Sequence, residues 1–75
     1  MRVYIVTYRY LADAERGIWS RESVSQEGYA TIEEAQQYIR NRTDHPVKVN
    51  DWYFQTQDGR QEYYIRDVLV RKSRH

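Results

Sequence analysis

The chain has 75 residues, with 12 Lys and Arg against 11 Asp and Glu, no cysteine, one proline and eight tyrosines. A chain of this length buries roughly 60% of its surface on folding, so we expect one domain at residues 1–71 and a short basic tail at 72–75. The lack of cysteine excludes disulfides, thiolate nucleophiles and Cys-type zinc sites, and it favours a cytoplasmic protein. The apolar run before Arg9 is too short for a signal peptide or a membrane span.

The first third of the chain has the composition of a β-hairpin. Residues 3–11 are rich in Tyr, Val, Ile and Thr and contain no Gly or Pro, which is typical of a strand. A polar stretch ending in Gly17 follows, and residues 18–24 then read as a second, partly exposed strand. We expect these two strands to pair.

A helix is predicted to begin at Thr31. Thr31 with Glu34 three positions later is a capping-box signature, and Ile32, Ala35 and Ile39 follow helical spacing, together with Tyr38. Gln36 and Gln37 fall on the other faces of this helix. Asn41 to Pro46 should end it, which gives a helix of roughly eleven or twelve residues.

The last part of the chain predicts a second hairpin. Residues 47–55 and 63–71 read as strands, separated by Gln57-Asp58-Gly59-Arg60, where Asp-Gly suits a tight turn. The expected fold is therefore α+β: a four-stranded antiparallel sheet with one helix on one face, in the order β-β-α-β-β.

The predicted strands carry large apolar or aromatic residues on both faces. Strand 3–11, for example, has Val3 and Ile5 on one face but Tyr4, Val6, Tyr8 and Tyr10 on the other. One helix covers only part of one face of a four-stranded sheet, so the opposite face should meet a partner or remain exposed. Tyrosine also occurs on exposed sheet faces simply because it fits a pleated surface. We expect a binding module that self-associates or binds a host protein through this face or a strand edge, with interface candidates Tyr4, Val6, Tyr8, Tyr10, Trp52 and Tyr64.

Enzymatic chemistry has little support in this sequence. His45 lies beside Pro46 in a loop and His75 is terminal, and neither has a neighbour at metal-ligand spacing. The three glycines stand in separate turns and form no phosphate-binding loop. We therefore expect no catalytic residue, no metal, no cofactor and no small-molecule substrate.

Binding of DNA or RNA is the alternative function. Arginine beside aromatic side chains can contact phosphates and stack on bases, and the candidates are Arg9, Trp19, Arg21, Arg71, Lys72 and Arg74. Acidic residues are interleaved among these cations, which favours their being ordinary ion-pair partners. A net charge of +1 is also lower than most autonomous nucleic-acid binders carry.

Two motifs carry a resemblance to known families. A strand is followed by Gly17-Ile18-Trp19-Ser20-Arg21-Glu22-Ser23, and then by Gly28-Tyr29-Ala30-Thr31-Ile32-Glu33-Glu34-Ala35. Residues 8–42 thereby resemble the arm-type DNA-binding domain of phage and transposon tyrosine recombinases, in which a sheet enters the major groove. That resemblance implies a DNA-contacting role for Arg9, Trp19 and Arg21. The second motif, the length and the element order are also similar to those of small α+β proteins of phages, prophages and bacteria, some of which bind host defence complexes.

Overall fold

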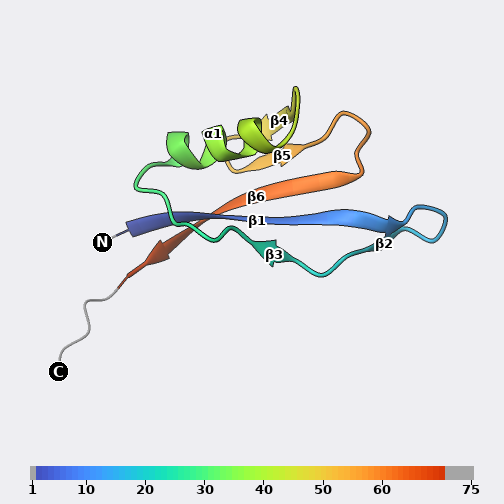
Figure 1. Cartoon of the computed structure of the whole chain (residues 1–75), viewed down its shortest axis with the longest axis horizontal. Helices are drawn as coiled ribbons and strands as arrows, with labels where there is room; N and C mark the ends of the chain where they lie inside the picture. The colour runs from blue at the N-terminus through green and yellow to red at the C-terminus, as the bar shows by residue number, and fades with distance from the viewer. Residues whose placement is uncertain (1, 71–75) are drawn as a thin grey trace.

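Residues 2–70 are described by a computed structural model, in which one helix lies against one face of an antiparallel sheet (Figure 1). The strands run in the order β2-β1-β6-β5-β4, and β3 pairs with β1 on the same side as β2. In chain order the elements are β1 (Arg2–Asp13), β2 (Ile18–Trp19), β3 (Ser23–Val24), α1 (Ile32–Arg42), β4 (Val47–Asn50), β5 (Tyr53–Gln55) and β6 (Gln61–Leu69).

The expected four-stranded sheet in the order β-β-α-β-β is wrong, because within residues 2–70 the sheet has six strands. Both differences arise where one long strand was expected and two short ones form. The expected strand end at Arg71, the domain boundary there and the tail at 72–75 lie outside the described residues.

The expected strand at 18–24 is interrupted at Ser20. Its hydroxyl accepts a hydrogen bond from the Tyr10 amide at 3.0 Å and donates one to the Arg21 carbonyl, also at 3.0 Å. Leu11 pairs with Trp19 and Tyr8 with Ser23, so two residues of β1 face three residues of this edge. The extra residue is a bulge, which divides the edge into β2 and β3.

The expected strand at 47–55 folds back on itself as the β4–β5 hairpin. The Asn50 side chain accepts a 2.8 Å hydrogen bond from the Trp52 amide, and Lys48 pairs with Asp51 at 2.9 Å. An Asn side chain that bonds the backbone two residues later is a turn-forming arrangement. The residues at 47–55 that favour β-structure therefore form two short antiparallel strands, β4 and β5.

The helix agrees with the sequence prediction at both ends. The Thr31 hydroxyl caps α1 by accepting a 3.2 Å hydrogen bond from the Glu34 amide, and the helix ends at Arg42 after eleven residues. Ala35 and Ile39 are fully buried, as expected from their spacing. The expectation that Gln36 faces outward is wrong. It is buried, and its amide donates to the Asp51 carbonyl at 3.0 Å, which ties α1 to the β4–β5 turn.

The core lies between α1 and one face of the long β1–β6 ladder. Val6 is directly opposite Ile65 in this ladder and Tyr8 is opposite Tyr63, so these four side chains share a face. The buried cluster consists of Val6, Ala35, Ile39, Phe54, Tyr63 and Ile65. We call this side of the sheet the helix face.

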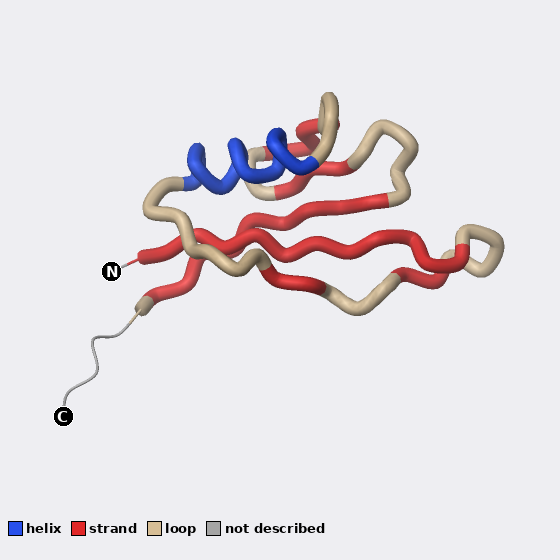
Figure 2. Tube along the Cα trace, in the orientation of Figure 1, coloured by secondary structure: helices blue, strands red, loops and turns tan. Residues whose placement is uncertain are grey.

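The other side of the sheet is left without a helix among residues 2–70 (Figure 2). At 1.5 Å per residue α1 is about 16 Å long, whereas the twelve residues of β1 extend about 40 Å, so the helix also leaves part of β1 uncovered. We call this second side the open face. Its residues, assigned by register, are Val3, Ile5, Thr7, Arg9, Tyr53, Gln55, Glu62, Tyr64, Arg66 and Val68.

Candidate functional site: the open sheet face

Three of the interface candidates lie on the helix face. Val6 is completely buried in the core, and Tyr4 and Tyr8 are partly buried against the core cluster. The side chains of β1 alternate between the two faces of the sheet, as predicted. The sequence did not determine which of the two sets packs against the helix. The side of β1 that does not meet the helix therefore carries its odd-numbered residues.

The other three candidates are dispersed. Tyr10 is 57% exposed and lies beyond the helix towards β2, and Trp52 is 42% exposed with its ring 6.0 Å from that of Tyr4. Tyr64 is the one member of this set on the open face, where its ring stacks on Tyr53 at a centroid distance of 4.5 Å. The six candidates thus do not form a single surface.

A buried carboxylate is the centre of the open face. Glu62 pairs with the guanidinium of Arg9, and its other oxygen accepts a 2.8 Å hydrogen bond from the Tyr53 hydroxyl. Arg9 in turn lies over the Trp19 ring, with its Cζ atom 4.9 Å from the ring centroid. Burial raises the pKa of Tyr53, and the hydrogen bond to Glu62 raises it further against an opposing bond from Gln55. Tyr53 therefore remains a neutral donor to the carboxylate.

A second arginine continues this network across the sheet. Arg66 donates from Nε to the Thr7 hydroxyl at 3.2 Å and pairs with Glu22 at 3.2 Å. Its Cζ atom lies 5.8 Å from the centre of the Tyr64 ring. Thr7 and Glu62 are both buried although they lie on the side without the helix, because arginine and tyrosine side chains lie over them.

Apolar side chains flank this network at one end. Val3 and Val68 are directly opposite each other in the β1–β6 ladder, and Ile5 lies next to them opposite Arg66. Val68 is 42% exposed, and Val3 and Ile5 are half-buried. The open face thus combines an apolar end with a hydrogen-bonded middle. We call the middle the Arg–Glu network; its members are Thr7, Arg9, Trp19, Glu22, Tyr53, Glu62, Tyr64 and Arg66.

The nucleic-acid candidates are only partly brought together. Arg9 and Trp19 are in contact, but the charge of Arg9 is already paired with Glu62. Arg21 is exposed at the bulge between β2 and β3. Arg71, Lys72 and Arg74 lie outside the described residues.

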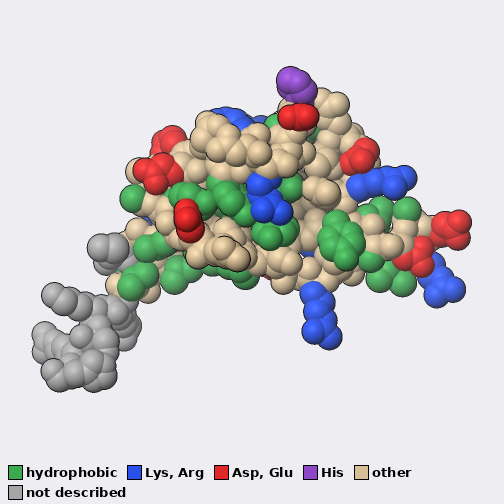
Figure 3. Space-filling model, viewed as in Figure 1, with side chains coloured by type: hydrophobic (Ala, Val, Ile, Leu, Met, Phe, Trp, Pro, Cys, Tyr) green, Lys and Arg blue, Asp and Glu red, His purple; other side chains and the backbone are tan. Residues whose placement is uncertain are grey.

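Acidic and basic side chains are interspersed on the molecule. On the side visible in Figure 3, Lys and Arg side chains alternate with Asp and Glu and form no continuous basic area. Ion pairs contribute to this: Arg2 pairs with Asp67 and Arg16 with Asp13, in addition to those of the Arg–Glu network and of Lys48. On this side, the described residues form no basic stripe of the kind expected of a nucleic-acid-binding surface.

Comparisons with known proteins provide no further assignment. No protein-family model matches the chain, and no curated protein or solved structure is significantly similar to it. Within residues 2–70, no three His, Cys, Asp or Glu side chains are grouped in a way that would hold a metal ion. No helix in that part of the chain is long and apolar enough to cross a lipid bilayer.

Sequence reasoning missed most members of the Arg–Glu network. Thr7, Glu22, Tyr53, Glu62 and Arg66 were not among the candidates, although Glu62 carried a signal. It is an acidic residue directly before the apolar run of β6, and Arg9 lies opposite it in the ladder. Recognising the pair requires the register of β1 against β6, which depends on contacts between segments more than fifty residues apart.

Proposed function

We propose that this protein is a non-catalytic binding module that forms a homodimer through its open face. The single observation that carries this proposal is that the arginines of the open face are neutralised by carboxylates of the same chain. Both of these arginines have a carboxylate partner, Arg9 with Glu62 on the same face and Arg66 with Glu22 of the adjoining segment before β3. The result is a surface of Tyr, Trp, Arg and Val side chains without a dominant charge, and Tyr, Trp and Arg are the residues enriched at protein interfaces.

The charge pattern favours a second copy as the partner. In a twofold-symmetric dimer the same patch is used on both subunits, so a strongly charged patch would repel itself. The open face avoids this because its cations and anions are present in pairs. A cytoplasmic location is part of the proposal, since a chain without cysteine needs no oxidising compartment.

The size of the face sets the expected strength of the dimer. About eight residues of the β1–β6 ladder at 3.4 Å, and four strands at about 4.8 Å, give an area of about 500 Å² per copy. The total of about 1,000 Å² is at the lower end for a specific interface. We therefore expect a dimer that dissociates on dilution rather than an obligate one.

Nucleic acid and host protein are the competing partners. Phosphate binding would require Arg9 or Arg66 to leave its carboxylate, which makes nucleic acid the less well supported of the two. A host protein could use the same open face, and it would leave the isolated chain monomeric. The resemblance to recombinase arm domains remains a prediction for Arg9, Trp19 and Arg21.

Sedimentation velocity over a wide range of protein concentration, at low and high salt, tests the proposal. We expect a monomer–dimer equilibrium that changes little with salt, because neutral aromatic and apolar contacts are weakly screened. Val68→Glu places a charge at the apolar end of the open face and should abolish the dimer. Leu69→Glu is the matched control: Leu69 is the next residue of β6, points to the opposite side and is 64% exposed.

Two outcomes would overturn the proposal. The first is a monomer at every concentration, which would redirect the search to a host protein. The second is a dimer that responds equally to both substitutions or only to Leu69→Glu, because the interface would then lie elsewhere. A fluorescence anisotropy titration with labelled single-stranded and duplex DNA tests the nucleic-acid alternative. If the protein binds DNA, its affinity for the DNA should fall steeply as the salt concentration rises.

A further inference from the structure

A groove with aromatic walls lies on the helix side of the sheet, away from the open face. It has a volume of about 460 Å³, within the range of small-molecule sites, and is open to solvent on one side. Three tyrosines and Arg42 contribute to its walls, and the segment between β3 and α1 forms its outer rim. The lining residues are Tyr8, Val24, Gln26, Glu27, Tyr29, Tyr38 and Arg42.

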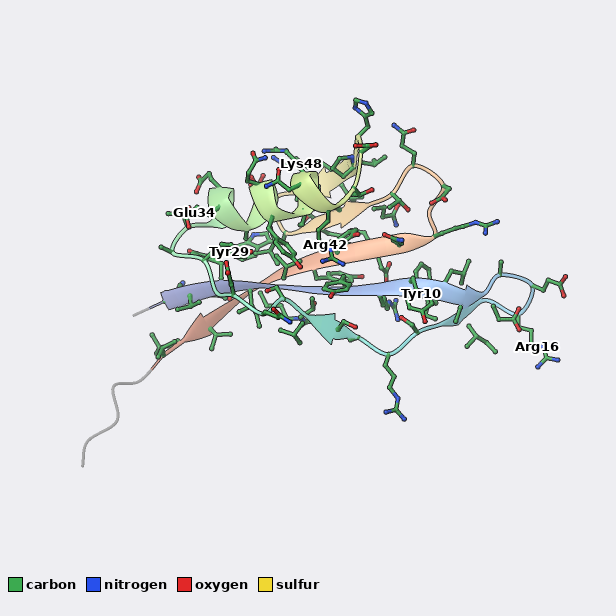
Figure 4. All side chains as sticks on the ribbon, viewed as in Figure 1. Tyr10, Arg16, Tyr29, Glu34, Arg42 and Lys48 are labelled. Atoms are coloured by element: carbon green, nitrogen blue, oxygen red, sulfur yellow. The ribbon has the colours of Figure 1, made fainter. Side chains whose placement is uncertain are left out.

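Arg42 is held in this groove by aromatic rings. Its Cζ atom lies 4.6 Å from the ring centroid of Tyr8 and 5.5 Å from that of Tyr38, and it donates to the Tyr38 hydroxyl at 3.1 Å. Figure 4 shows Arg42 extending from α1 towards β1, with Tyr29 nearer the start of the helix. The rings of Tyr29 and Tyr38 are 5.6 Å apart, so the aromatic wall is continuous along the groove.

The charge of Arg42 is not matched by a carboxylate. The ion pairs among residues 2–70 involve Arg2, Arg9, Arg16, Lys48 and Arg66, and Arg42 is in none of them. A guanidinium has five N–H donors, and those not bonded to tyrosine hydroxyls remain for a ligand. A cation fixed on aromatic rings with donors to spare is suited to a planar oxyanion, which it can bind through two parallel hydrogen bonds.

Negative groups near the groove restrict the charge of that ligand. Glu27 lines the groove, and Asp44 and Asp58 line a neighbouring hollow together with Arg42. Burial raises the pKa of Tyr29, and the nearby Glu27 carboxylate raises it further, which places Glu27 at the Tyr29 end. Among residues 2–70, Arg42 is the one cation that lines the groove, and the Glu27 carboxylate lines it as well, which favours a ligand with a single negative charge over a dianion.

We infer that this groove is a binding site for a small aromatic carboxylate. The carboxylate pairs with Arg42, and the ring of the ligand stacks against the walls formed by Tyr8, Tyr29 and Tyr38. The site is independent of the proposed dimer, because these side chains lie on the helix side of the sheet.

An NMR titration of the full chain with benzoate, benzamide and phenyl phosphate tests this inference. Benzoate should produce saturable amide shifts that cluster at Tyr8, Tyr29, Tyr38 and Arg42. Benzamide has nearly the same shape without the charge, and it should bind about tenfold or more weakly. Phenyl phosphate, which is largely dianionic at neutral pH, should also bind more weakly than benzoate.

Variants of the groove provide the second arm of the test. Arg42→Gln should weaken benzoate binding about tenfold to a hundredfold, while Arg40→Gln, on the same last turn of α1 and exposed, should leave it unchanged. Arg42→Lys retains the charge but not the planar fork, and its affinity should be intermediate. Glu27→Gln should tighten binding by a few fold.

The inference is overturned if benzoate causes no saturable shifts at millimolar concentration, or if benzamide binds as well as benzoate. It is also overturned if Arg42→Gln retains full affinity while its spectrum shows that the fold is intact. Tighter binding of phenyl phosphate than of benzoate would contradict the single-charge argument. Sedimentation of the Arg42→Gln variant keeps this result separate from the dimer proposal, since its self-association should match that of the unmodified chain.

Discussion

The carboxylate of Glu62 and the guanidinium of Arg9 form an ion pair on the open face, and the Glu62 side chain is only 6% exposed there. Burial of a charge is costly unless the charge is paired and hydrogen-bonded, and here Arg9 and the Tyr53 hydroxyl provide both compensations. The pair joins β1 to β6 directly, and through Tyr53 it also reaches β5. It therefore holds three strands together on the side where no helix packs.

Removing Arg9 should consequently destabilise the fold more than removing an ordinary surface arginine. Arg9→Met leaves Glu62 buried without its cation, so we expect the free energy of unfolding to fall; the partial exposure of Arg9 keeps the loss below that of a fully buried pair. Arg16→Met is the control, because the Arg16–Asp13 pair is exposed and should contribute less than about 0.5 kcal/mol. Urea denaturation followed by circular dichroism measures both, and equal effects would contradict the role given to Glu62.

A side chain at Gly28 is expected to destabilise the fold. A Cβ atom at this position would overlap Cγ1 of Val3, because the segment after β3 crosses close to the start of β1, where Tyr29 and Tyr4 exchange two backbone hydrogen bonds. Gly28→Ala should lower the free energy of unfolding by about 1–3 kcal/mol through this overlap. Thermal denaturation of Gly28→Ala, Val3→Ala and the double variant tests this cause. Val3→Ala shortens the neighbouring side chain, so it should recover part of the stability lost in Gly28→Ala. Purely additive effects of the two substitutions would show that the overlap is not responsible.

Local signals in the sequence were sufficient for α1 and for the turn before β6. The Thr31 cap and the Asp58-Gly59 turn each act within a few residues, and Gly59 has the positive φ of 71° that such a turn requires. The interruptions at Ser20 and Asn50 are also local, since both side chains bond nearby backbone groups. They were overlooked because β-branched and aromatic residues on both sides favoured one continuous strand.

The side of β1 that meets the helix could not be predicted from the strand itself. Tyr4, Val6 and Tyr8 alternate with Val3, Ile5 and Thr7, and either set can form a core. The choice is made by contacts far away in sequence, where Ile39 and Ile65 enclose Val6. For the same reason the Arg–Glu network was not predicted, because its members come from β1, β2, β5 and β6 and the segment before β3.

The packing of the helix depends on one polar side chain, that of Gln36. Its buried side chain bonds the Asp51 carbonyl, so Gln36→Ala would remove the side-chain hydrogen bond that joins α1 to the β4–β5 turn and leave that carbonyl without this donor. We expect a loss of about 1–2 kcal/mol in the free energy of unfolding. Gln37→Ala is the matched control, because Gln37 is exposed and bonds only Asn41 on its own helix. Chemical denaturation measures the two variants, and a larger effect of Gln37→Ala would show that the helix is not anchored through Gln36.

The turn before β6 should make a pH-dependent contribution to stability. Hydrogen bonds from the Thr56 hydroxyl at 2.6 Å and from the Arg60 amide at 3.0 Å hold the pKa of Asp58 below its ordinary value of 3.8. Since the pKa is lower in the folded state, the ionised carboxylate stabilises the fold above pH 3.8. This contribution is lost as the pH falls through the lowered value.

Asp58→Asn tests this contribution, because the amide oxygen still accepts hydrogen bonds but carries no charge. Urea midpoints of the two proteins should differ at neutral pH and converge in acid, when Asp58 is protonated in both the folded and the unfolded chain. The other carboxylates titrate alike in the two proteins, so their effects cancel in the difference. A midpoint difference that stays constant from neutral pH into acid would mean that the charge of Asp58 does not stabilise the turn.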